Sequence, residues 1–177
     1  YADKASLLWL DYDTGVSGPV LDDIAIALPK LNAGSIFIVT LSAKKDDLPK
    51  VDDVGNPIGP GQALRRIVGD LMPGDVPEKR FRKPDYPRLV GEIVGNRFKS
   101  VHLRNEREEV WVELFDIVYS DSTPMITVGG MIVPRTSAET VKSLVSSPKW
   151  RGGPPGKNTP PPPTPKGKIV RCRVRAV

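Results

Sequence analysis

The sequence has little cysteine and histidine, few aromatic residues and no long apolar run. Its 177 residues contain one cysteine, Cys172, which excludes an internal disulfide and a cysteine-based metal site and fits a reducing compartment. The one histidine, His102, is expected to be a surface residue, which argues against a histidine-dependent catalytic triad. No stretch approaches the roughly 18 to 20 apolar residues of a membrane helix, and no secretory signal is present, so the sequence predicts a cytoplasmic protein without membrane contacts.

Acidic residues are missing from the end of the chain. Residues 149–177 contain eight basic residues and no acidic one, whereas the rest contains 18 basic and 21 acidic residues. The formal charge of +5 therefore belongs to the tail, and the remainder offers no basic surface of the kind that binds nucleic acid. Residues 148–168, rich in proline and glycine, predict an extended linker, and residues 169–177 predict a terminal basic strand. This tail is the expected contact surface for a protein partner.

The first 43 residues predict a strand, a helix and a second strand. The apolar run Ser6–Leu10 predicts a parallel strand that is buried on both faces and whose carboxyl end reaches solvent. Pro19 in the first turn predicts the start of a helix, and Pro29 predicts its end. The branched apolar run Ser35–Leu41 predicts a second buried strand. Together these elements indicate an α/β fold.

The remaining elements complete a domain over residues 1–147. Two aromatic and β-branched runs, joined by a short turn-forming loop, predict an antiparallel hairpin. The expected elements are a loop over 44–60, helices over 61–72 and 89–101, hairpin strands over 109–119 and 125–133, and a final helix opened by a capping box at 136–139.

Three segments carry a resemblance to a known family: LLWLDYD, PVLDDIAIALPKLNAGSIFIVTLSA and FDIVYSDSTPMITVGGMIV. They resemble a family of bacterial proteins described as predicted O-methyltransferases, whose hairpin carries a Met-x-Thr-Val-Gly-Gly signature. Here the signature begins at Met125, continues with Thr127 and ends at Gly130, and the similar segments span most of residues 6–133.

The resemblance implies a Rossmann-like three-layer sandwich, with a mostly parallel sheet and a terminal antiparallel hairpin. Class I methyltransferases end with a helix between the last two parallel strands and a reversed final strand, so the chain resembles the C-terminal half of such a domain. The implied activity is methyl transfer from S-adenosylmethionine to a hydroxyl acceptor, which could be a small molecule or a protein.

The residues that normally hold this donor are not found in the sequence. Methyltransferases use a glycine-rich loop after the first strand and an acidic residue after the second. Gly15 and Gly18 follow a strand, but their spacing does not match such a loop. Because the sequence also starts at Tyr1 rather than methionine, we expect the domain to be incomplete at its N-terminus and the donor site to lie in an upstream half.

The candidate catalytic residues are Asp11, Tyr12 and Asp13, at the carboxyl end of what is expected to be a central strand. Open α/β sheets bind their ligands there, so these residues could orient an acceptor or remove the proton of its hydroxyl. Thr14 and Thr40 are the candidate substrate-binding residues. The structural alternative is that a carboxylate caps the following turn and that Tyr12 and Thr40 simply pack. No metal is predicted, because no Asp-Asn pair follows Thr40.

Two alternative functions stay open. The chain could be a catalytically inactive methyltransferase fold that serves as a binding or assembly module. It could also be a haloacid-dehalogenase-type phosphatase, since LLWLDYDT resembles that family's strand ending in Asp-x-Asp, with Asp11 as nucleophile. That family places a threonine after a glycine at this point, whereas here Thr14 precedes Gly15.

Overall fold

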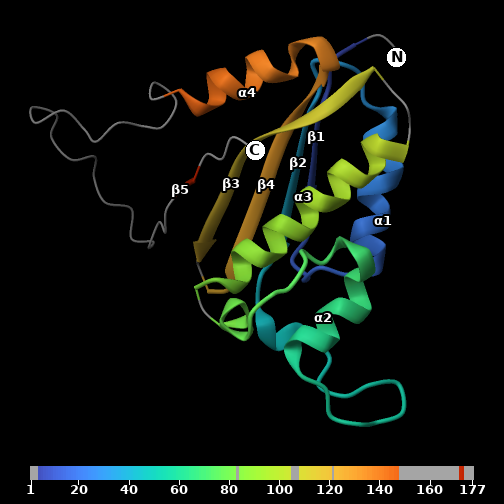
Figure 1. The fold of residues 1–177 in the computed structure, drawn as a ribbon, viewed down its shortest axis with the longest axis vertical. Helices are drawn as coiled ribbons and strands as arrows, with labels where there is room; N and C mark the ends of the chain where they lie inside the picture. Colours follow the sequence, from blue (N-terminus) through green and yellow to red (C-terminus); the bar gives the residue numbers. More distant parts are fainter. Residues whose placement is uncertain (1–3, 83, 105–107, 121, 148–171, 174–177) are drawn as a thin grey trace, which may run out of the picture.

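The computed structural model describes residues 4–82, 84–104, 108–120, 122–147 and 172–173 of the chain. These residues form one mixed sheet with long helices against one of its faces (Figure 1). The strand order is β1-β2-β4-β3-β5. The strands are β1 (Leu7–Asp11), β2 (Ile36–Ser42), β3 (Glu109–Ser120), β4 (Pro124–Pro134) and the two-residue β5 (Cys172–Arg173).

The predicted hairpin is confirmed, but its second strand lies in an unexpected place. β4 pairs antiparallel with β3 and also with β2, whereas β1 and β2 are parallel. β1, β2 and β3 therefore all run in one direction. The predicted α/β fold is therefore present with a sheet that mixes parallel and antiparallel pairings, because β4 lies between β2 and β3 and both of its pairings are antiparallel.

The helices begin and end close to the residues that the sequence predicts. They are α1 (Gly18–Ala27), α2 (Pro60–Val68), α3 (Tyr86–Arg104) and α4 (Ala138–Ser146). α1 has proline in its first turn and stops at a short 3₁₀ turn that contains Pro29. α3 continues through two buried glycines, where a Cβ atom would lie 3.4 Å from Ile126 at Gly91 and 3.3 Å from Glu113 at Gly95. These glycines let α3 lie close to the sheet.

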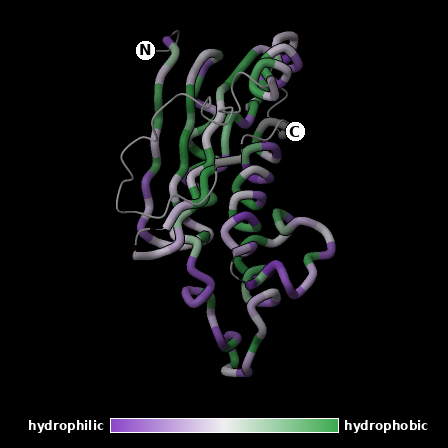
Figure 2. The backbone as a smooth tube through the Cα atoms, turned by 90° about the vertical axis from the view of Figure 1, so that its left-hand side faces the viewer, coloured by the Kyte–Doolittle hydropathy of each residue, from purple (hydrophilic) through white to green (hydrophobic). Residues whose placement is uncertain are grey.

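The main hydrophobic core lies between the sheet and the helices α1 and α3. Alternate residues of the strands point into it, and Figure 2 shows hydrophobic residues along the strands and hydrophilic segments in the loops below them. Phe98 of α3 is fully buried and makes two ring contacts. Its ring stacks on Trp111 with centroids 4.2 Å apart and meets the edge of Phe37 at 5.1 Å. These three rings join α3 to β2 and β3.

The opposite face of the sheet is covered only in part by the described residues. Ala138 of α4 packs against Val112 and Val133 at one end of this face. Leu7 and Trp9 of β1 are 65% and 56% exposed. The prediction of a strand buried on both faces is therefore wrong, because β1 lies at the edge of the sheet, not in its centre, and no described element covers its second face.

The predicted capping box at the start of α4 is also wrong. A 3₁₀ turn over Arg135–Ser137 leads directly into α4, and Ser137 already has a helical backbone conformation and makes no side-chain cap. The side chain of Glu139 instead accepts a hydrogen bond from Lys142 at 3.0 Å.

Part of the sequence-based prediction lies outside the described residues. This applies to the linker over 148–168, to the side chain of His102 and to most of the predicted terminal strand. The two described residues of that strand, β5, pair antiparallel with β3 at Asp116 and Ile117. Among the described helices, none has the length and apolar character needed to cross a membrane.

Candidate functional site

The carboxyl ends of β1 and β2 stay together beyond the last residues of the two strands. The backbone NH of Tyr12 donates to the carbonyl of Thr40 at 3.0 Å, and the NH of Ser42 donates to the carbonyl of Thr14 at 3.0 Å. The segment after β1 and the segment after β2 therefore lie at the same edge of the sheet, where α/β proteins bind their ligands.

A cavity of about 480 Å³, here called the strand-end cavity, opens at this edge. Its walls come from the segments that follow β1 and β2 and from the start of α3. The residues that matter for its chemistry are Asp13, Thr14, Ser17, Lys44, Asp47 and Tyr86. Two carboxylates, one ammonium group, two hydroxyls and a phenol thus surround one volume that is large enough for a small organic molecule.

Asp47 is held in this cavity by the end of β2. Its Oδ2 accepts a hydrogen bond from the hydroxyl of Ser42 at 3.2 Å, and its Oδ1 lies 4.0 Å from the Nζ atom of Lys44. Ser42 is the last residue of β2 and is 2% exposed. A buried strand residue therefore positions the Asp47 carboxylate, which in turn leaves acceptor capacity for a ligand proton.

Tyr86, the first residue of α3, is the most buried of the polar residues that line the strand-end cavity. It is 3% exposed and lines the strand-end cavity. Burial, and then the negative charge of Asp47, raise the pKa of Tyr86 well above its ordinary value of 10.0. Tyr86 is therefore protonated at neutral pH and can donate a hydrogen bond to an oxygen atom in the cavity.

A second cavity of about 370 Å³, here called the hairpin cavity, adjoins the first. Lys44 and Tyr86 line both cavities, so the two volumes lie on either side of these side chains. The hairpin cavity also contacts Phe81, Val118 and Tyr119. The NH of Ala43 donates to the carbonyl of Pro124 at 2.7 Å, which holds the end of β2 against the hairpin.

The structure brings two of the five predicted site residues into the strand-end cavity. Asp13 and Thr14 line it, whereas Asp11, Tyr12 and Thr40 line neither of the two cavities. Asp11 is an exposed residue at the last position of β1 and lies opposite Thr40 in the strand register. The catalytic and substrate-binding roles of all five residues stay predictions.

Tyr12 and Thr40 have partners inside the protein. The hydroxyl of Tyr12 donates to Oδ2 of Asp23 in α1 at 2.7 Å, and burial, followed by this bond, raises the pKa of Tyr12 to about 12. The buried Thr40 hydroxyl accepts from the indole NH of Trp9 at 3.0 Å and lies 2.9 Å from the hydroxyl of Thr127. These three side chains form a polar row across β1, β2 and β4.

Sequence reasoning missed the two residues that are best placed in the cavities. Asp47 belongs to an Asp-Asp pair directly after β2, and acidic residues at a strand end are the available signal. No comparable sequence pattern points to Tyr86, because its place in the cavity depends on where α3 begins relative to the sheet.

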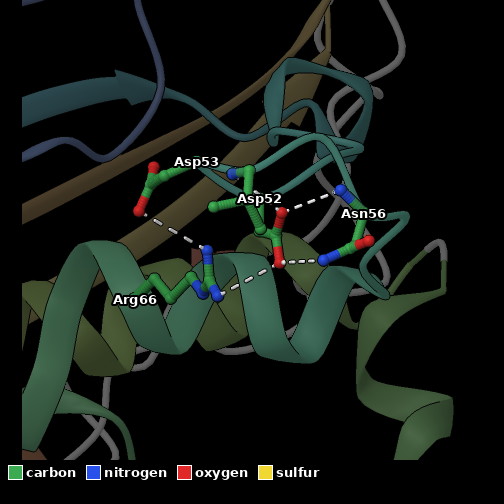
Figure 3. A network of polar contacts seen from close by, with 5 residues as sticks. Asp52, Asp53, Asn56 and Arg66 are labelled. Carbon is green, nitrogen blue, oxygen red and sulfur yellow. Dashed lines mark hydrogen bonds and ion pairs between the residues drawn. The ribbon is translucent and has the colours of Figure 1, made fainter.

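The loop after Asp47 is anchored to α2 (Figure 3). Asp52 accepts hydrogen bonds from the backbone NH groups of Asn56 at 2.8 Å and Val54 at 3.1 Å. Arg66 of α2 lies 3.6 Å from Asp52 and 3.7 Å from Asp53. The bond from the Asn56 backbone, more than any other contact, lowers the pKa of Asp52 below 3.8. This loop borders the strand-end cavity through residues 48 and 49.

Comparison with known proteins gives the family. The model of a family described as "putative O-methyltransferase" matches residues 1–153, which is most of the chain. The protein belongs to this O-methyltransferase family. S-adenosylmethionine is the usual methyl donor of methyltransferases. No curated protein and no solved structure matches the chain.

Gly15 and Gly18, which follow β1 in this O-methyltransferase family member, do not have the surroundings of a donor-binding loop. A donor-binding loop uses glycine where a side chain would block the close approach of the backbone to the ligand. A Cβ atom would make an ordinary contact of 3.7 Å at Gly15 and would meet nothing within 4 Å at Gly18. The described residues also contain no group of three or more side chains that could hold a metal ion.

Proposed function

We propose that residues 1–153 are the acceptor-binding part of an S-adenosylmethionine-dependent O-methyltransferase. The observation that carries the proposal is the strand-end cavity, which contains Asp13, Asp47 and Tyr86 at the carboxyl ends of two parallel strands. Membership of the O-methyltransferase family supports it. The family gives no support to the phosphatase hypothesis for Asp11.

The topology supports a Rossmann-like C-terminal half. A class I methyltransferase ends with parallel strands separated by a helix and with a reversed last strand, and here β4 runs opposite to β2 and β3 and lies between them. The exposed Leu7 and Trp9 form an apolar surface along β1, on which a donor-binding segment would pack. In this proposal the donor site lies outside the described residues.

The cavity residues suit the activation of a hydroxyl group. Asp47 and Asp13 are carboxylates that can receive the acceptor's proton, and a hydroxyl oxygen becomes a better nucleophile as its proton passes to such a base. Tyr86 stays protonated and therefore acts as a hydrogen-bond donor that orients the acceptor oxygen. Ser42 holds the Asp47 carboxylate in position.

Calorimetric titration with S-adenosylmethionine tests the proposal on the gene product that contains these residues. We expect binding, and we expect Asp47→Asn to slow methyl transfer by roughly 10²- to 10⁴-fold, with donor affinity unchanged. Asp75→Asn is the matched control, because Asp75 is exposed and lines neither cavity. A well-folded gene product that does not bind S-adenosylmethionine would rule out the enzyme.

One observation favours a second candidate function, a non-catalytic binding module. β1 is an edge strand, and its exposed Leu7 and Trp9 could pack against a partner that adds a strand to the sheet. The same titration separates the two candidates, because a module of this kind binds no methyl donor. The predicted partner contacts of the tail stay a prediction and lie outside the described residues.

A further inference from the structure

We propose that the acceptor is a hydroxyl compound with a flat apolar body and an anionic group, the chemistry of an aromatic hydroxy acid. This inference rests on the proposed function, because it assigns the substrate class of the same site. In this arrangement the hydroxyl lies in the strand-end cavity, the flat body in the hairpin cavity and the anion beside Lys45.

The shape of the site supports a ligand that spans both cavities. The two volumes, about 480 and 370 Å³, are neighbours that share Lys44 and Tyr86 in their linings, and in this proposal one molecule reaches past these side chains to occupy both. Tyr86 is 3% exposed as a residue and lines both cavities, and its phenol is a hydrogen-bond donor. In this proposal a ligand oxygen between the two cavities accepts a hydrogen bond from this hydroxyl.

The lining of the hairpin cavity supports a flat apolar body. Phe81 is 3% exposed and contributes a ring, and Tyr119 and Val118 of β3 contribute further apolar surface. Three prolines, at 84, 87 and 124, complete the wall with rigid, uncharged groups. Aromatic rings contact one another favourably in such a setting, and the rigid wall leaves little freedom to be lost on binding.

The net charges of the two cavities differ in sign and favour one orientation of the bound ligand. The strand-end cavity has Asp13 and Asp47 against Lys44, whereas the hairpin cavity has Lys44 and Lys45 against Asp46. Asp47 already lies near Lys44, and no ion pair of Lys45 occurs within the described residues. An anionic group is therefore favoured at the Lys45 end and disfavoured beside the two carboxylates.

Three probes that share one carbon skeleton test this assignment on the present chain, without any methyl donor. They are 4-hydroxycinnamate, 4-hydroxycinnamyl alcohol, which lacks the anion, and cinnamate, which lacks the hydroxyl. Calorimetry or chemical-shift titration gives their affinities. We expect 4-hydroxycinnamate to bind best, and the other two to bind roughly tenfold more weakly, since each lacks one polar contact.

Single substitutions assign each contact. Lys45→Met is expected to remove the preference for 4-hydroxycinnamate over the alcohol, and Tyr86→Phe is expected to remove its preference over cinnamate. Lys50→Met is the matched control, because this exposed lysine lines neither cavity and should keep both preferences. Thermal unfolding of each variant checks that it is folded.

The outcomes distinguish this inference from the proposed function. Absence of binding by all three probes, or an acid preference that survives Lys45→Met, would overturn the substrate assignment even if the gene product binds S-adenosylmethionine. Binding of the probes with the expected preferences would uphold the site, and a simultaneous lack of donor binding would then overturn only the enzymatic role.

Discussion

Gly130 lies directly beneath the ring of Trp111, and its replacement by alanine tests why the hairpin contains a glycine pair. A Cβ atom at this position would overlap the indole at Cε2, Nε1 and Cζ2. Trp111 cannot easily move away, because it is 8% exposed and stacks on Phe98 with an angle of 5° between the rings. Gly129 has the same relation to Phe115 on the other face of the sheet.

The expected cost of Gly130→Ala follows from three effects. Inserting a methyl group into a packed core costs about 1–3 kcal/mol. Loss of the stacked pair between Phe98 and Trp111 adds about 0.5–1.5 kcal/mol. Alanine loses less backbone entropy on folding than glycine does, which offsets this cost by about 0.5–1 kcal/mol. The free energy of unfolding should therefore fall by about 2 kcal/mol.

Urea unfolding, followed by far-UV circular dichroism, measures this change. Gly18→Ala is the control, because nothing lies within 4 Å of that position, and it should be neutral or stabilise by up to about 1 kcal/mol. In a Trp111→Leu background the cost of Gly130→Ala should fall below about 0.5 kcal/mol, since the overlapping ring is gone. An equal cost in both backgrounds would refute the steric explanation.

Three further predictions concern the scaffold around the site. The pKa of Tyr12 is raised to about 12. Its contribution to stability, about 1 kcal/mol once solvent screening of this largely exposed pair is allowed for, is present below pH 10 and lost as the pH rises through 12, and Tyr12→Phe should remove this loss in alkaline unfolding curves. Arg97→Ala should lower the free energy of unfolding by about 1–3 kcal/mol, because the Nε atom of Arg97 donates to the Leu21 carbonyl at 2.9 Å. Arg65 is exposed, so the control Arg65→Ala should change the free energy of unfolding by less than about 0.5 kcal/mol. The pKa of Asp52 is lowered, so its contribution to the stability of the loop is present above pH 3.8 and lost at lower pH. Asp52→Ala should therefore speed proteolysis within residues 49–59 at neutral pH, and unchanged cleavage would contradict the role of its hydrogen bonds.

Local patterns in the sequence predict most helices and strands of the fold, but they do not predict which strands lie side by side in the sheet. The proline positions give the start and end of α1, and the turn between two apolar runs gives the hairpin of β3 and β4. The insertion of β4 beside β2 depends on contacts between residues far apart in the chain, such as Ile38 and Gly129. Likewise, the run at β1 predicts an apolar strand, but only its place at the sheet edge decides that Trp9 is exposed.

The strand-end cavity lies at the edge of the sheet where the sequence predicts a site, but it is lined by only two of the five predicted residues. The rule that ligands bind at the carboxyl ends of strands leads to Asp13 and Thr14, which do line the strand-end cavity. Asp11 is close to them in sequence and pairs with Thr40 in the strand register, but alternate strand residues point to opposite faces, and Thr40 joins the row with Trp9. Tyr86 reaches the cavity from a helix whose position no local pattern specifies.

The position of β4 means that the ligand site cannot form until β4 has been synthesised. β1 and β2 are synthesised before β4, and β2 meets its second neighbour only when residues 125–131 have been made. Val118, Tyr119 and Pro124, which line the hairpin cavity, come from the same late segment. Until then the backbone groups of β2 that face β4 are unpaired and its apolar side chains are uncovered. A ribosome-bound chain that ends before residue 124 should therefore bind chaperones and no acceptor.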